Sequence, residues 1–154
     1  MKSFETAKDV LDHSRHFHRQ LGELYARLSD NSGKERVKML LGYLSRHEKH
    51  LDESLSQYEE AVSEQILNTW FQFLPPKETM SLCEGLPLEV NTELTVDGIV
   101  DLALKYDDCL IHLYEAMINS TESEQVRAVF NNLLEMEKRE EVELVKNAFR
   151  LKGL

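Results

Sequence analysis

Three glutamates interrupt hydrophobic patterns that otherwise repeat with the spacing of an α-helix. Across residues 37–58, apolar side chains recur every three or four positions, and Glu48 is the exception. Across residues 126–144, the exceptions are Glu137 and Glu140. A carboxylate inside a helical bundle is costly unless it is paired, protonated or bound to a metal ion. These positions therefore predict either a metal site or a buried polar network.

A repeat relates the two halves of the chain and shows which polar residues are equivalent. Residues 6–55 align with residues 95–144 at a constant offset of 89 positions, and 11 of the 50 aligned residues are identical. Glu48 and Glu137 are equivalent in this alignment. We therefore expect the two carboxylates to face each other near the middle of the bundle.

The other two predicted helices also carry polar residues at equivalent positions. His18 in the first half corresponds to Asp107 in the second. Each precedes a tyrosine by seven residues, which is two helical turns, so Tyr25 shares a face with His18 and Tyr114 shares one with Asp107. Carboxylate and imidazole ligands suit iron, manganese or zinc. In the alternative interpretation, His18 is charged and pairs with a carboxylate, and the tyrosines are core aromatic residues.

Four long segments carry the helical pattern, and short turns join them in pairs. The segments cover residues 10–28, 37–58, 99–117 and 126–144. Short turns imply antiparallel neighbours, so each half is predicted to be a helical hairpin. We expect a single domain over residues 1–154, made of a hairpin (6–62), a long crossover (63–94) and a second hairpin (95–151).

Capping residues mark the predicted ends of the helices. Residues 32–35 and residues 121–124 both fit the pattern of a capping box. Thr95 is expected to be the N-cap of the third long helix. In the crossover, the apolar residues 66–73 either extend the second helix or form a short helix of their own, and the two prolines at 75–76 end any helix there.

Composition and charge narrow the range of partners. The chain of 154 residues has a formal net charge of −10 at pH 7, which argues against nucleic acid and against an anionic membrane surface. Cys83 and Cys109 form no CxxC pair, and no signal peptide is found, so we expect a reduced chain in the cytoplasm. A homodimer is expected, in which Trp70, Phe71 and Phe73 either form the interface or cover one end of the bundle.

With its repeated hairpins and long crossover, the sequence resembles the ferritin-like superfamily, and rubrerythrin-type proteins in particular. The resemblance covers about residues 6–150 apart from the crossover. It implies an all-α four-helix bundle with a di-iron centre, to which two helices each give a Glu and two each give Glu-x-x-His. Matched by repeat and pattern, the six ligand positions hold His18, Glu48, Leu51, Asp107, Glu137 and Glu140.

Four of these positions depart from the ligand set that the resemblance implies. His18 and Asp107 stand in place of glutamates, while Leu51 and Glu140 stand in place of histidines. Leu51 has no donor atom. The predicted ligands for iron or manganese are therefore His18, Glu48, Asp107, Glu137 and Glu140.

Alternatives remain open for both the ligands and the function. A register shifted by one residue offers His47 and His50 as an i, i+3 pair that lies off the apolar pattern. In one functional hypothesis the chain binds iron or manganese in its core and has redox or peroxide-related activity, as the resemblance implies. In the other it is a metal-free, ferritin-like interaction or regulatory module with a degenerate site. Leu51 in a ligand position favours the second hypothesis.

Overall fold

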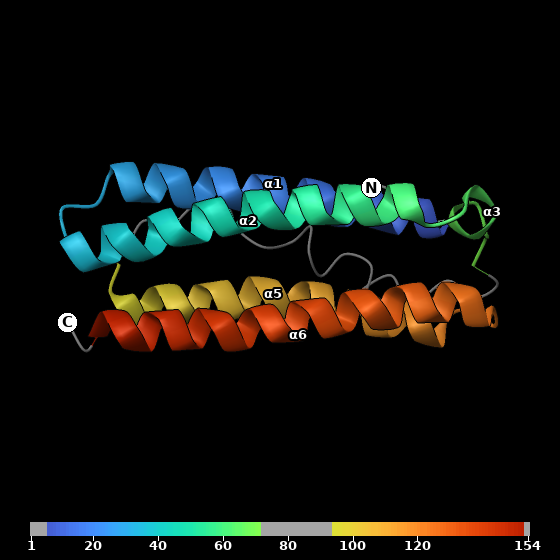
Figure 1. Ribbon diagram of the computed structural model, residues 1–154. Coiled ribbons are helices and arrows are strands. Elements are labelled where there is room, and N and C mark those ends of the chain that lie inside the picture. The colour runs from blue at the N-terminus through green and yellow to red at the C-terminus, as the bar shows by residue number, and fades with distance from the viewer. Residues whose placement is uncertain (1–5, 72–93, 153–154) are drawn as a thin grey trace.

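The chain folds into two pairs of long helices that lie side by side, as Figure 1 shows. The computed structural model describes residues 6–71 and 94–152. Its helices are α1 (Ala7–Asp30), α2 (Glu35–Ala61), α3 (Glu64–Leu67), α5 (Val96–Asn119) and α6 (Glu124–Lys152). The described residues contain no β-strand, only an isolated bridge between Thr6 and Trp70. The prediction of an all-α bundle is therefore confirmed.

Each pair is made of two long helices that follow one another along the chain. Helix α1 packs along α2, and α5 packs along α6. The connections, residues 31–34 and 120–123, are short, so the helices of each pair are antiparallel. Helix α2 also contacts both α5 and α6, which brings the two pairs together around one core. The origin of the two pairs by duplication stays a prediction.

Only part of the predicted crossover lies within the described residues. Residues Glu64–Leu67 form α3, a short helix that is separate from α2 and has Ser63 as its N-cap. Of the two interpretations of this segment, the separate short helix is the one observed. Residues 72–93, which include Phe73 and Cys83, lie outside the described part of the chain. The division into two hairpins and a crossover stays a prediction.

Two of the long helices begin at well-formed caps. The Thr6 hydroxyl accepts a hydrogen bond from the Asp9 N–H (3.3 Å), and the Asp9 carboxylate accepts one from the Thr6 N–H (3.0 Å), which completes a capping box. The Thr95 hydroxyl accepts a hydrogen bond from the Gly98 N–H (3.0 Å), as predicted for an N-cap. These caps fix where α1 and α5 begin, and therefore the level of the side chains that they direct into the core.

The predicted capping boxes at residues 32–35 and 121–124 are wrong. Lys34 is the N-cap of α2 and makes no side-chain capping bond, while the Ser32 hydroxyl accepts a hydrogen bond from the Lys34 N–H (3.3 Å). At the start of α6, the Ser123 hydroxyl accepts a hydrogen bond from the Val126 N–H of the first turn (3.2 Å). The predicted caps fail because short hydroxyl side chains bond equally well to the backbone within a turn.

Helix α1 lies close to α2 at Gly22, beside the polar residues of the core, and a Cβ atom there would make ordinary van der Waals contacts. A Cβ atom at Gly22 would lie 3.4 Å from the Ser45 carbonyl oxygen and 3.5 Å from the Cβ atom of Glu48. The Ser45 hydroxyl donates a hydrogen bond to the Gly22 carbonyl (2.9 Å). Gly22 follows His18 by about one helical turn. This contact therefore helps to set the spacing between His18 and Glu48.

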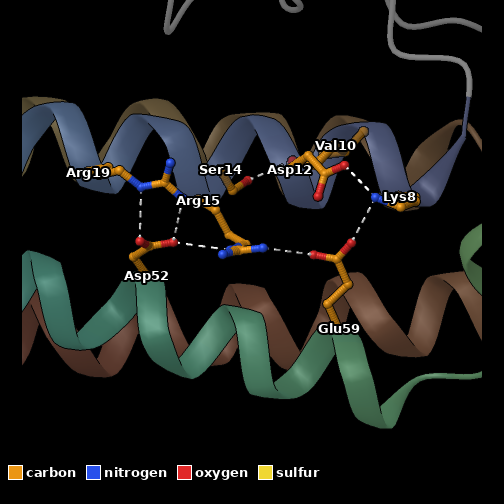
Figure 2. Close-up of polar contacts among 8 residues, drawn as sticks. All are labelled: Lys8, Val10, Asp12, Ser14, Arg15, Arg19, Asp52 and Glu59. Atoms are coloured by element: carbon orange, nitrogen blue, oxygen red, sulfur yellow. Dashed lines mark hydrogen bonds and ion pairs between the residues drawn. The ribbon is translucent and has the colours of Figure 1, made fainter.

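Charged residues link α1 to α2 at the surface, as Figure 2 shows. Asp52 accepts hydrogen bonds from Nε of Arg15 and from Nε of Arg19, both at 3.1 Å. Glu59 pairs with Lys8 at 3.2 Å and with Arg15 at 3.6 Å. Burial alone raises the pKa of Asp52, but the hydrogen bonds and charges of Arg19 and Arg15 outweigh it and lower the pKa. We call this group of residues the surface network.

The sequence predicted reduced cysteines and a cytoplasmic location, and these two expectations have different outcomes. Cys109 is disulfide-bonded, so the expectation of a reduced chain is wrong at this residue, and its partner lies outside the described residues. Disulfides are uncommon in reducing compartments. None of the described helices is long and apolar enough to cross a membrane. The cytoplasmic location stays a prediction.

Candidate functional site in the bundle core

Three buried side chains from three helices form a hydrogen-bonded group in the core. His18 of α1 lies between Glu48 of α2 and Glu137 of α6. Its Nδ1 atom is 2.5 Å from Oε2 of Glu48, and its Nε2 atom is 2.8 Å from Oε1 of Glu137. None of the three residues is more than 3% exposed. We call this group the core triad.

The surroundings of His18 favour its charged form. Burial lowers the pKa of His18, but the charges of Glu137 and Glu48 and the hydrogen bonds to both raise it well above the ordinary value of 6.5. An imidazolium has two N–H donors, one for each carboxylate, whereas a neutral ring has only one. The protonated ring therefore satisfies both contacts and places a positive charge between two buried carboxylates.

Asp107, the repeat equivalent of His18, adds a polar side chain from α5, the long helix that contributes no residue to the core triad. Burial and the negative charges of Glu48 and Glu137 raise its pKa well above the ordinary value of 3.8, against the opposing charge of His18. Its carboxyl group is therefore biased towards the neutral, protonated form. Asp107 makes no hydrogen bond to a residue of the core triad, so it interacts with the triad through charge alone.

Two buried tyrosines belong to the same region. Burial raises the pKa of Tyr25, and the negative charges of Glu48 and Asp107 raise it further. Burial and the charge of Glu137 have the same effect on the pKa of Tyr114. The Tyr25 hydroxyl has no hydrogen-bond partner among the described residues. Both phenols are therefore held in their neutral form.

Glu140 forms an ion pair with His47, which joins α2 to α6 at the side of the core triad. Burial lowers the pKa of His47, but the hydrogen bond and charge of Glu140, followed by the charge of Glu48, raise it above its ordinary value. The Tyr43 ring stacks on His47 with the ring centroids 5.5 Å apart, and its hydroxyl accepts a hydrogen bond from Asn147 (2.9 Å). This pair was not predicted from the sequence. The sequence feature that could have indicated it is Glu140 itself, because a carboxylate on the apolar face of a helix needs a partner.

The predicted ligand positions therefore fall into three groups. His18, Glu48 and Glu137 are in direct contact, and Asp107 is buried beside them. Glu140 is engaged by His47. Leu51 is buried, and His50, the second residue of the alternative i, i+3 pair, is exposed. The shifted register therefore does not direct a histidine pair into the core.

These side chains do not fit a di-iron centre. The His18 ring occupies the space between the two carboxylates, Leu51 supplies no donor atom, and Glu140 is paired at the side of the core. Within residues 6–71 and 94–152, no group of three or more His, Cys, Asp or Glu side chains is arranged to hold a metal ion. Within the core triad, Oε2 of Glu137 is a buried oxygen that has no hydrogen-bond partner among these residues.

Comparison with known proteins identifies the fold. No protein-family model matches the sequence, and no curated protein matches it either. Among solved structures, the chain is similar to the crystal structure of a protein from Thermotoga maritima that is described as a ferritin-like diiron-carboxylate protein. The TM-score is 0.58 at 15% sequence identity, and the match covers 95% of this chain and 96% of that chain. The fold is therefore that of a ferritin-like helical bundle, as the sequence predicted.

Proposed function

We propose that this protein is a ferritin-like bundle in which a protonated histidine takes the place of a di-metal centre, and that it works as an interaction or regulatory module. One observation carries the proposal. Both ring nitrogens of His18 lie within hydrogen-bond distance of carboxylates that come from two other helices. The ring is thus the cation that two facing carboxylates require.

The physical argument is that an imidazolium can replace a bound cation as the partner of buried carboxylates. Leaving a buried charge without its partner costs about 3–5 kcal/mol. His18 offsets this cost with a positive charge and two charge-assisted hydrogen bonds, which are about twice as strong as neutral ones. The raised pKa of Asp107 removes a further negative charge from the core. The chain's own side chains therefore hold α1, α2 and α6 together.

Because the polar groups of such a core bond to one another, the bundle would contact its partners through its surface. Exposed apolar side chains gather on α6, at Val142, Val145 and Phe149, which is the kind of surface that binding partners cover. This supports a role in interaction over a role in chemistry at the core.

A second candidate function is the binding of one divalent cation, iron or manganese, in the same core. The observation that favours it is Oε2 of Glu137, a buried oxygen without a hydrogen-bond partner among the described residues, in a core that also contains Asp107. Together with Glu48, these oxygens would suit a hard cation. His18 would have to lose its proton and release a carboxylate. Redox or peroxide-related activity would depend on such an ion.

Metal analysis separates the two candidates. The protein is produced with added iron or manganese, purified, and its metal content is measured by mass spectrometry. The first candidate predicts less than stoichiometric metal, with no change in the Glu48→Ala/Glu137→Ala double variant. Stoichiometric metal that is lost in the double variant would support the second candidate and rule out the first.

A rebuilt ligand set gives a matched positive control. The changes His18→Glu, Leu51→His and Glu140→His together restore three of the four departing positions to the residue types that the resemblance implies, and Asp107 already supplies a carboxylate at the fourth. We expect the triple variant to gain metal. The double variant Leu51→His/Glu140→His keeps the His18 ring between the carboxylates and should stay low in metal. If the triple variant folds, as circular dichroism would show, and still takes up no metal, the role given to His18 is contradicted.

A further inference from the structure

The outward face of α2 carries positive charges that no neighbouring carboxylate balances. Lys38, Gly42, Arg46 and Lys49 follow one another at steps of four, four and three residues, so they form one stripe along the helix. The three charged residues are exposed, and none of them forms an ion pair within residues 6–71 or 94–152. We call these four residues the α2 basic face.

The sequence around the α2 basic face reverses the charge balance of the chain. From residue 36 to residue 50 there are four lysine or arginine residues and a single acidic residue, Glu48, which is buried in the core triad. The whole chain has 28 acidic and 18 basic residues. In the surface network, by contrast, Asp52 holds both Arg15 and Arg19. The α2 basic face is therefore a positive patch on a negative molecule.

Packing holds two of these cations against the bundle. A Cβ atom at Gly42 would lie 3.3 Å from a guanidinium nitrogen of Arg46, so the guanidinium lies against the bare helix there. A Cβ atom at Gly22 of α1 would lie 3.7 Å from Cγ of Lys49, so the lysine stem rests on α1. Met39, next to Lys38, adds an apolar side chain that is 47% exposed. The face thus combines positioned charges with an apolar contact.

We propose that the α2 basic face binds an acidic helical segment of another protein. The inference rests on the proposed role as an interaction module, and it names the chemistry of the partner. Lys38 and Lys49 are separated by 11 residues, or about 16 Å along the helix axis. A helix that lies along α2 can present carboxylates over this length at steps of three and four residues, together with an apolar side chain that covers Met39.

The layout of the charges argues against other occupants. A single phosphate ion needs cations that converge on one point, whereas these follow a line. A nucleic-acid duplex extends beyond the face and brings its phosphates against a chain with a formal charge of −10. A two-fold pairing of this face with itself would set cations against cations, which opposes binding. The homodimer expected from the sequence would therefore need a different surface, and it stays a prediction.

Fluorescence anisotropy with a model peptide tests the proposal on the full chain. The probe is a fluorescein-labelled, alanine-rich helical peptide of about 20 residues, with glutamates at steps of three and four and one central leucine. We expect a dissociation constant between about 1 µM and 1 mM that rises with salt. The same peptide with glutamine in place of glutamate should bind at least about tenfold more weakly, because the charge attraction is lost.

Charge reversal places the binding on α2. The triple variant Lys38→Glu/Arg46→Glu/Lys49→Glu should raise the dissociation constant at least about tenfold, because three attractions become repulsions. The matched control reverses three exposed lysines of α5 and α6, Lys105→Glu/Lys138→Glu/Lys146→Glu. It changes the net charge equally, so it should weaken binding far less. Circular dichroism checks that both variants keep their helices.

Several outcomes would overturn the proposal. These are a wild-type chain that does not bind the acidic peptide, a triple variant of α2 that binds it as tightly as wild type, and equal losses in the two triple variants. A DNA duplex that binds more tightly than the peptide would also overturn it, because the face would then bind phosphates. The metal content of the core is measured separately, so this inference and the proposed function can fail independently.

Discussion

The core triad and the surface network use the same kind of bond with different consequences. In each, a carboxylate of α2 meets a cation of α1, since Glu48 meets His18 and Asp52 meets Arg15. The side chains of Arg15 and Asp52 are 27% and 17% exposed, while those of His18 and Glu48 are 0% and 4% exposed. Exposed pairs contribute about 0–1 kcal/mol, whereas a buried charge without its partner costs about 3–5 kcal/mol. Burial, more than the kind of charge, decides how much each pair matters.

The largest effect is expected from His18→Leu, which removes the cation from the core triad. Glu48 and Glu137 would remain buried without the cation that lies between them, so the free energy of unfolding should fall by about 3–5 kcal/mol. Urea denaturation measures this change. His16→Leu is the matched control, because His16 lies on the exposed side of the same helix, and its effect should stay within about 0.5 kcal/mol. A loss below about 1 kcal/mol for His18→Leu would show that burial does not amplify the pair.

Replacing the whole core triad should have the opposite sign. The triple variant His18→Leu/Glu48→Leu/Glu137→Leu removes the desolvation cost of three polar groups together with their attraction. Exchanges of this kind are neutral or stabilise by about 1–4 kcal/mol. The same denaturation experiment should therefore find the triple variant at least as stable as wild type. A triple variant as unstable as His18→Leu alone would mean that the triad stabilises the fold through more than charge balance.

The pH dependence of stability should distinguish the two regions further. Because the pKa of His18 is higher in the folded chain, its contribution is complete below about pH 6.5 and is lost as the pH rises through the folded value. The raised pKa of Asp107 acts in the same direction, since its contribution is present below about pH 3.8 and declines above it. The free energy of unfolding should therefore decrease above neutral pH.

His18→Leu and Asp107→Asn separate these two contributions. His18→Leu should flatten the decline above pH 6.5, and Asp107→Asn should flatten the part that begins at lower pH. Denaturation midpoints at a series of pH values provide the measurement. A wild-type curve that rises above neutral pH would contradict the assignment of a proton to His18.

The smallest effect is expected in the surface network. Asp52→Asn removes the acceptor shared by Arg15 and Arg19 and should cost about 1 kcal/mol or less. Salt at about 1 M screens exposed charges to a few ångströms, so the difference from wild type should shrink there. The loss caused by His18→Leu should persist at high salt, because buried pairs are screened much less. Equal salt sensitivity in the two variants would remove the distinction between the two regions.

Much of the fold could be predicted because burial follows sequence periodicity. Glu48, Glu137 and Asp107 were predicted to lie in the core, and all three are buried. The start of α5 at Thr95 was predicted as well, because an N-cap acts on its own helix. The caps of α2 and α6 were not, since neighbouring serine and threonine residues compete for the same turn.

The partners of the polar side chains were harder to predict. The sequence placed Glu140 on the pattern of α6 but did not connect it with His47, which lies on another helix. It also left open whether His18 would bind a metal or a carboxylate. The answer depends on the rotation of each helix about its axis and on the distance between helices, and periodicity constrains both only loosely.

The sequence by itself determined the ferritin-like bundle and the burial of Glu48 and Glu137 at equivalent positions, because a repeated helical pattern fixes which face of each helix avoids water. Only the tertiary structure decided that His18 lies between those carboxylates and contacts both. The reason is that a hydrogen bond forms over about 3 Å, whereas a pattern of residues specifies a face of a helix and not the atom that the face will meet.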